Sequence, residues 1–166
     1  MEELAIHAKG MEPASYEPRT LKGMGLAFAT SGRGACHLRA TVYKAELSGM
    51  IPPAQVEGKA EILIDFEDRH TLFDTLILCR FFRDLYPWDK IAIIVNATTG
   101  MELDKSQLRK IAWTISTEAR EFNLREGMIP ERDEILPERF SGKSWKIAAR
   151  CCLRPTLIKC CRIVMR

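Results

Sequence analysis

The segment between Asp104 and Gly127 has the clearest periodic pattern of apolar and polar positions in the chain. Apolar residues recur there at spacings of three and four from Leu108 to Phe122. This spacing is typical of an amphipathic helix, because it places the apolar residues on one face. Asp104 and Gln107 match a capping box, and Gly127 supplies a stop at the carboxyl end. The pattern therefore predicts a long amphipathic helix.

A second region, residues 59–85, is apolar on more than one face and predicts a buried helix or a pair of helices. It contains a carboxylate, Asp74, and a thiol, Cys79, five residues apart in an otherwise apolar run. Burial of an ionisable group is costly unless it is paired or ligated, so this is either ordinary core or a core opened for a cofactor. Free cysteine usually behaves as a buried hydrophobe, which favours ordinary core. On one unbroken helix the two side chains would point about 140° apart, so they could share a ligand only at different places or across a helix break.

The amino-terminal third has two weaker signals. Apolar Leu4, Ile6 and Ala8 alternate with Glu3, Ala5 and His7, which predicts a short strand. Thr20 is expected to cap a helix that runs to about Ala29. Gly23 and Gly25 lie inside this helix and indicate that another element packs closely against its backbone.

Glycine and proline residues mark the boundaries between the predicted elements in the rest of the chain. Residues 49–58 predict a linker between helical parts. Residues 88–96 predict a further short element, which we interpret as a helix because its neighbours are helical. Residues 97–100 predict a turn. Together these patterns predict a mainly α-helical fold with a short N-terminal strand.

The segment from Thr30 to His37 is a glycine-punctuated turn. Small residues allow a backbone to approach a ligand closely, and this loop would present His37 to that ligand. The alternative is a plain turn with a surface histidine, and spacing alone favours that alternative.

Composition limits the class of protein. A length of 166 residues suits one domain, and 46% hydrophobic and 28% charged residues are ordinary for a globular protein. No apolar run reaches about 18 residues, so we expect no membrane span. The first residues lack the basic-then-apolar order of a signal peptide, which favours a cytoplasmic protein. Because the chain begins almost inside the predicted strand, we expect Met1 to be an internal methionine of a longer protein.

Charge divides the chain near position 140. All 22 acidic residues but only 18 of the 25 Lys and Arg residues precede position 141, which leaves residues 1–140 with a net charge of −4. Residues 141–166 hold the other seven basic residues and the cysteine pairs at 151–152 and 160–161. We therefore expect a helical domain over residues 1–140 and a separate basic, cysteine-rich tail over residues 141–166.

Several segments, taken in order, resemble the C-terminal, mainly helical part of the aldehyde ferredoxin oxidoreductase family. They are Leu21-Lys22-Gly23-Met24-Gly25-Leu26-Ala27, Ala29-Thr30-Ser31, Arg33-Gly34-Ala35-Cys36-His37-Leu38-Arg39, Asp74 to Cys79, Ala97-Thr98-Thr99-Gly100, Phe122 to Gly127, Arg132-Asp133 and Leu136-Pro137. The resemblance covers about residues 3–140.

The resemblance implies oxidation of aldehydes to carboxylic acids at a tungsten held by two pterin dithiolenes. Electrons would leave through a 4Fe-4S cluster to ferredoxin. In the motif Asp-x-x-Gly-Leu-Cys, Asp74 and Leu78 would lie at the pterin, and Cys79 would be the fourth cluster ligand, as thiolates hold such clusters. His37 matches a histidine beside the metal and would relay protons.

The sequence departs from the family pattern at several points. The glycine of the motif is Ile77 here, which removes backbone freedom and adds bulk beside the pterin. The other three cluster cysteines, in a Cys-x-x-Cys-x-x-x-Cys pattern, are absent, as is the N-terminal domain. We therefore expect this chain alone to be inactive and to need the missing N-terminal part as a partner. A homo-oligomer is left open.

The tail has three interpretations. Its paired cysteines could bind a metal, although their spacing is unusual for zinc. Its basic residues could bind nucleic acid, which gives the alternative function of a non-catalytic helical binding module. We favour out-of-frame translation and no nucleic-acid partner, because the tail has no pattern that would bury a core and is expected to be disordered.

Overall fold

The computed structural model describes residues 5–141, and the predictions about the tail from residue 142 onward lie outside this range. The described chain is mainly helical, as predicted. Its elements in order are α1 (Lys22–Thr30), α2 (Val42–Leu47), α3 (Lys59–Thr75), the 3-10 helix η2 (Arg80–Leu85), α4 (Trp88–Thr99), α5 (Lys105–Arg125), α6 (Pro130–Asp133) and α7 (Glu138–Ser141). No described helix is both long and apolar enough to cross a bilayer.

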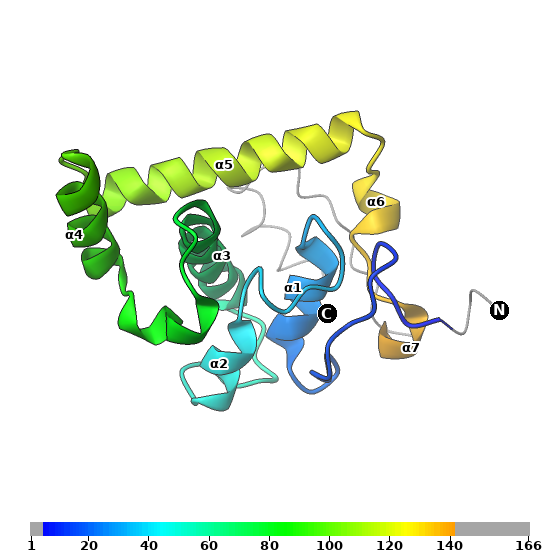
Figure 1. The fold of residues 1–166 in the computed structure, drawn as a ribbon. Helices are drawn as coiled ribbons and strands as arrows, with labels where there is room; N and C mark the ends of the chain where they lie inside the picture. Colours follow the sequence, from blue (N-terminus) through cyan, green and yellow to red (C-terminus); the bar gives the residue numbers. More distant parts are fainter. Residues whose placement is uncertain (1–4, 142–166) are drawn as a thin grey trace.

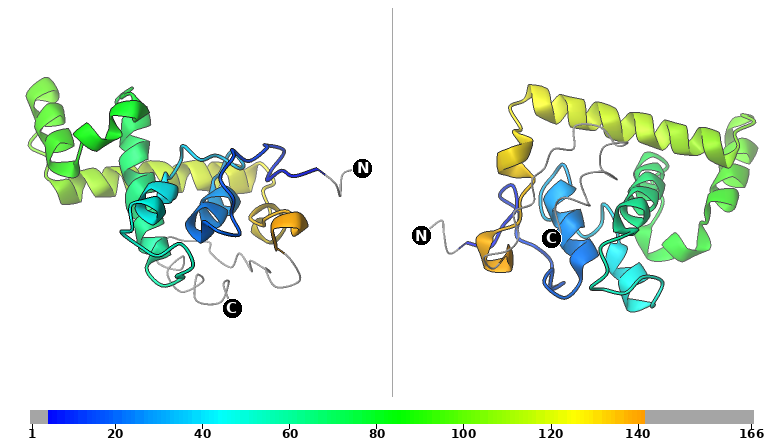
Figure 2. Two further views of the ribbon diagram at one scale, coloured as in Figure 1. Left: turned by 90° about the horizontal axis from the view of Figure 1, so that it is seen from below. Right: turned by 180° about the vertical axis from the view of Figure 1, so that it is seen from behind.

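The long helix α5 runs along one side of the molecule, with α1, α2 and α3 on its inner side (Figure 1). Both views of Figure 2 place α4 and the α6–α7 segment at opposite ends of α5. Helix α3 packs against α5 and also contacts α1 and α2. The candidate residues Asp74 and Cys79 lie at the end of α3 and just beyond it, and His37 lies in the loop between α1 and α2.

Two apolar clusters form the core. The first joins α1, α2 and the start of α3, and Leu136 closes it from the carboxyl end of the described chain. The second joins the end of α3 to α4 and the start of α5, around Phe73, Trp88 and Leu108. Because each cluster includes part of α3, this helix connects the two halves of the fold.

The amino-terminal strand is reduced to a minimal contact. Within the described residues 5–8, only Ala8 pairs with another segment, in an isolated antiparallel bridge to Met11 with N–O distances of 3.0 and 3.1 Å. A two-residue bridge without a further strand cannot extend into a sheet. The alternating pattern therefore becomes an extended lead-in to α1.

Helix α1 begins later than predicted, but its glycines behave as expected. The cap position is Leu21 rather than Thr20, and no side chain caps the helix. A Cβ on Gly23 would collide with the side chain of Val42 in α2. At Gly25 a Cβ would lie 3.2 Å from Leu136 Cδ1. The close packing predicted from the two glycines is confirmed.

A buried ion pair joins the first three helices. Lys59 at the start of α3 pairs with Glu46 of α2, and both side chains are 0% exposed. Glu46 Oε1 also accepts the backbone N–H of Gly23 over 2.8 Å.

The linker prediction for residues 49–58 is confirmed, because this segment separates α2 from α3.

The predictions for α4 and α5 hold with two corrections. Asp104 and Gln107 form the capping box, and Gly127 follows the end of α5 with a φ of 94°. Helix α4, however, continues through the predicted turn to Thr99, and only Gly100 turns out of it, with a φ of 73°. The apolar stripe of α5 is buried only at Leu108 and Ala112, and Phe122 is 54% exposed.

Candidate functional site

Helix α3 ends between the two candidate residues Asp74 and Cys79. Its last residue is Thr75, and the chain leaves it in a left-handed turn at Ile77, whose φ is 57°. The backbone N–H of Ile77 donates to Asp74 O over 3.2 Å, and that of Leu78 donates to Phe73 O over 2.8 Å. This pair of bonds is a Schellman motif, which normally has glycine at the left-handed position.

The backbone thus adopts a glycine-type conformation although the residue is isoleucine. A β-branched side chain with positive φ is unusual and strained, by about 1–2 kcal/mol. The Ile77 side chain is 92% exposed, so no described neighbour compensates for the strain by packing. Isoleucine thus occupies a left-handed position that glycine would occupy without this strain.

The helix break exposes both polar groups. Asp74 lies in the last turn of α3 and its side chain is 52% exposed. Cys79 precedes η2, is solvent-exposed and is a free thiol. Leu78 between them is half-buried against the second core cluster. The interpretation as ordinary core, which the residues alone favoured before the family resemblance was considered, is therefore wrong at Asp74 and Cys79, whereas Leu78 does pack inward.

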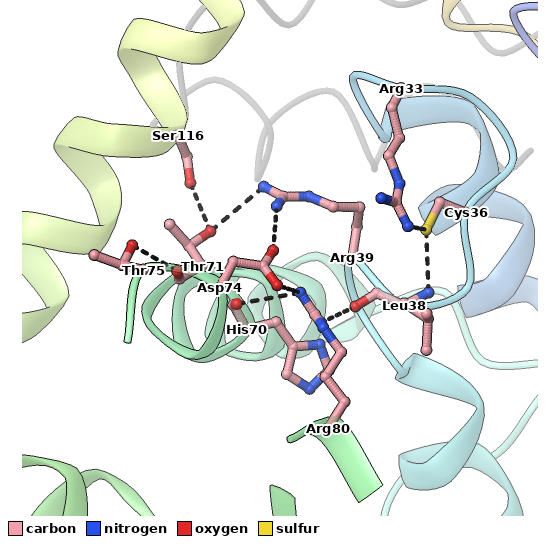
Figure 3. A network of polar contacts seen from close by, with 10 residues as sticks. All are labelled: Arg33, Cys36, Leu38, Arg39, His70, Thr71, Asp74, Thr75, Arg80 and Ser116. Carbon is pink, nitrogen blue, oxygen red and sulfur yellow. Dashed lines mark hydrogen bonds and ion pairs between the residues drawn. The ribbon is translucent and has the colours of Figure 1, made fainter. Parts of the chain in front are cut away.

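Two arginines hold the Asp74 carboxylate (Figure 3). Arg39 Nη1 lies 3.1 Å from Asp74 Oδ2, and Arg80 Nη2 lies 2.6 Å from Asp74 Oδ1. Arg39 comes from the loop after His37, and Arg80 directly follows Cys79. The carboxylate therefore links both segments that carry candidate residues.

The arginines extend this network to neighbouring elements, as Figure 3 shows. Arg80 donates to the backbone oxygens of Leu38 and His70. Arg39 Nη2 lies 3.4 Å from Thr71 Oγ1, which in turn lies 3.1 Å from Ser116 Oγ of α5. The loop before α2, the end of α3, η2 and the middle of α5 are thus connected by one set of polar contacts.

His37 lies half-buried in the loop, with its ring centroid 5.6 Å from that of Tyr16. Burial lowers the pKa of His37, and the nearby charges of Arg33 and Arg83 lower it further. The imidazole is therefore neutral at neutral pH. Among the described contacts, Asp74 is linked to the region of His37 through Leu38 and Arg39, and not through the His37 ring.

Two further polar side chains lie inside the site. Cys36 is buried, and its Sγ lies 2.7 Å from Arg33 Nη2 and 3.4 Å from the backbone nitrogen of Leu38. His70 is fully buried, and neither of its ring nitrogens has a hydrogen-bond partner among the described residues. Burial, with the positive charges of Arg80 and Arg69, lowers the pKa of His70 to about 3.

The described residues fit part of the implied cofactor set. Within residues 5–141, no group of three or more His, Cys, Asp or Glu side chains could hold a metal ion. A 4Fe-4S cluster requires four ligands, of which the exposed Cys79 could supply one. Asp74 could still serve a pterin, because an ionised carboxylate has about four acceptor sites and only two are used by arginines.

The sequence patterns did not identify Arg39 and Arg80 as site residues. Their only signal was position: Arg39 closes the segment that contains His37, and Arg80 directly follows Cys79. Arg39 lies 35 positions from Asp74, so only the tertiary structure could pair them.

The described chain is thus a mainly helical domain in which an exposed thiol, Cys79, follows five residues after a carboxylate, Asp74, that two arginines bind. Residues 1–150 match the family described as aldehyde ferredoxin oxidoreductase, domains 2 & 3. The chain belongs to the aldehyde ferredoxin oxidoreductase family.

Curated relatives agree with this assignment. The chain is 34% identical to the tungsten-containing aldehyde ferredoxin oxidoreductase of Pyrococcus furiosus over 142 residues, which are 83% of this chain and 24% of the relative. The same values hold for the Thermococcus kodakarensis protein of that name. The Pyrococcus horikoshii protein is 31% identical over 83% of this chain and 23% of its own. The chain thus spans about a quarter of the length of these relatives.

Proposed function

We propose that this chain is the C-terminal part of a cytoplasmic tungsten-pterin oxidoreductase that oxidises aldehydes to carboxylic acids. Electrons would pass through a 4Fe-4S cluster to ferredoxin. The observation that supports this best is the exposed pair Asp74 and Cys79, separated by a left-handed turn at the position where the family motif has glycine. When bound, the cofactor supplies tungsten and its dithiolene ligands for the oxidation.

In this proposal Asp74 and Leu78 of the chain lie at the pterin, and Cys79 binds the iron–sulfur cluster. Asp74 accepts hydrogen bonds from pterin N–H groups with the acceptor sites that Arg39 and Arg80 leave open. Leu78 lies beside it as the apolar residue of the motif. Cys79 supplies one thiolate to the cluster.

His37 is the proposed proton relay. Its pKa is lowered by burial and by the charges of Arg33 and Arg83, so its imidazole is neutral and able to accept a proton at neutral pH. Aldehyde oxidation to an acid releases protons, and a neutral histidine near the reaction centre can carry them away.

An incomplete site requires the rest of the enzyme. The turn around Cys79 carries large exposed apolar side chains, including Ile77, Phe81 at 91% exposure, Phe82 and Leu85. An exposed apolar patch of this kind marks an interaction surface. We propose that the N-terminal part of the enzyme covers it and supplies the other three thiolates. The chain alone is then inactive.

We propose that residues 1–140 form the helical domain of this part of the enzyme and that residues 141–166 form a separate tail.

The test is co-expression of this chain with the N-terminal part of a relative, followed by measurement of iron content and of the EPR signal of the reduced cluster. The variant Cys79→Ala should lose most of the iron and the signal. Cys36→Ala is the matched control, because Cys36 is buried and hydrogen-bonded to Arg33. An unchanged cluster in Cys79→Ala would contradict the proposal.

A further inference from the structure

Positive side chains from three elements surround the carboxylate of Asp84. We call Lys44 of α2, Arg69 of α3 and Arg83 of η2 the cationic cluster. Asp84 pairs with Lys44, and its pKa is lowered by the hydrogen bond from Lys44 and by the charges of Arg83 and Arg69. Among the described residues, neither Arg69 nor Arg83 forms an ion pair. Three positive charges thus face one carboxylate.

The two arginines also retain unsatisfied donors. Arg83 donates from Nη1 to Arg80 O over 2.8 Å and from Nη2 to Tyr43 Oη over 3.2 Å. The guanidinium of Arg69 lies over the ring of Phe66, with Cζ 5.2 Å from the ring centroid. The Nε atoms of both arginines are buried and have no hydrogen-bond partner among the described residues. A buried donor without a partner is uncommon in native proteins and needs an explanation such as a bound ion.

The neighbouring groups respond to this surplus of positive charge. Burial lowers the pKa of Arg69, and Arg83 lowers it further against the partial compensation from Asp84. The charge of Arg83 also contributes to the lowered pKa values of His37 and His70. An anion placed at the cluster would offset the repulsion among these positive charges, which adds to the effect of burial.

We propose that the cationic cluster binds a phosphate group, either inorganic phosphate or the phosphate of a small organic molecule. The planar guanidinium presents paired N–H donors that match the oxygens of phosphate. A phosphate monoester carries a charge of about −1.5 to −2 at neutral pH, which balances the surplus of two positive charges in the cluster. A single carboxylate would leave half of that surplus uncompensated. The site uses none of the residues assigned to redox chemistry, and its test is independent of that chemistry.

The experiment is a titration of the isotope-labelled 166-residue chain with inorganic phosphate, followed by NMR at constant ionic strength in a phosphate-free buffer. We expect saturable shifts of signals from residues around Arg69 and Arg83. We also expect the pKa of His37 to rise toward its ordinary value, because the anion neutralises Arg83. A parallel titration with ethyl phosphate distinguishes the sources: binding of both probes supports a site open to an organic phosphate, and binding of phosphate alone supports a site for the free anion.

The variants Arg69→Gln and Arg83→Gln should each weaken binding at least tenfold. Arg125→Gln is the matched control, because it removes the same charge and a similar contact, with Arg125 Cζ 6.0 Å from the Phe122 ring centroid. Arg69 makes no hydrogen bond among the described residues, so Arg69→Gln remains informative if Arg83→Gln perturbs the fold. The proposal is overturned if neither probe binds saturably, or if Arg125→Gln weakens binding as much as Arg69→Gln does.

Discussion

Arg80 and Asp74 form an ion pair of 2.6 Å across the break at the end of α3. The same guanidinium donates to the backbone oxygen of Leu38, the residue after His37, and Arg80 itself follows Cys79. One side chain therefore ties the segment of the proposed cluster ligand to the segment of the proposed proton relay. The link consists of the hydrogen bond to the backbone oxygen of Leu38 and the ion pair with Asp74.

The first prediction is that Arg80→Gln destabilises the chain and loosens the turn that carries Cys79. Arg80 is mostly buried but Asp74 is half-exposed, so we expect a loss of about 1–2 kcal/mol in the free energy of unfolding. Urea unfolding gives this value, and the rate of iodoacetamide labelling at Cys79, read by mass spectrometry, should increase. Arg19→Gln breaks an exposed pair with Glu17 and should change neither quantity appreciably. Equal effects of the two variants would contradict the prediction.

The second prediction is that Ile77→Gly stabilises the chain. Glycine removes the left-handed strain of about 1–2 kcal/mol, from which its larger entropy in the unfolded state subtracts about 0.5–1 kcal/mol. Little packing is lost, because the Ile77 side chain is exposed. We expect a higher urea midpoint than for the parent chain. Ile77→Ala keeps a Cβ at the positive φ and should gain less, so a glycine variant no more stable than the alanine variant would refute the account.

The third prediction concerns pH. The pKa of His70 is about 3 in the folded chain, against about 6.5 when unfolded. Above pH 6.5 neither state binds the proton, and stability is complete. Below pH 6.5 the unfolded state gains a proton that the folded state rejects, so the free energy of unfolding falls by up to about 1.4 kcal/mol per pH unit until about pH 3.

Urea unfolding at pH 7, 6 and 5 measures this slope. The titration of two carboxylates with strongly lowered pKa values does not contribute to the slope between pH 7 and pH 5. Hydrogen bonds from Arg19 and Arg132 lower the pKa values of Glu17 and Asp133 to about 2, so their contributions disappear only below about pH 4.5. In His70→Phe, where a ring is kept beside Phe73, the slope should decrease, leaving the smaller part due to His37. A variant with the parental slope would show that His70 is not the titrating group.

The fourth prediction is that Lys59→Met is strongly destabilising. It leaves Glu46 charged, buried and held only by the backbone N–H of Gly23, and breaking such a pair on one side costs about 3–5 kcal/mol. Thermal or urea unfolding measures the loss. Adding Glu46→Gln removes the stranded charge, keeps an oxygen for Gly23 and should restore part of the stability. If the double variant is less stable than Lys59→Met alone, the buried charge is not the cause.

Local signals in the sequence predicted those features that depend on neighbouring residues along the chain. The capping box at Asp104 and Gln107 needs only residues three positions apart, and it formed as predicted. Gly23 and Gly25 indicated close packing, because only glycine allows that approach. The turn at residues 97–100 was predicted too early, because α4 stays helical to Thr99 and the chain leaves it only at Gly100, whose backbone N–H still donates to Asn96 O over 2.9 Å.

By itself the sequence determined a mainly helical chain, its family and the candidate residues His37, Asp74, Leu78 and Cys79, because these follow from periodicity and from ordered motifs. Only the tertiary structure decided that α3 ends between Asp74 and Cys79, that Arg39 and Arg80 share the Asp74 carboxylate, and that half of the α5 stripe stays exposed. The physical reason is that a charge or an apolar face has no fixed partner along the chain. Which residues a charge or an apolar face contacts is determined only when distant segments of the chain pack together.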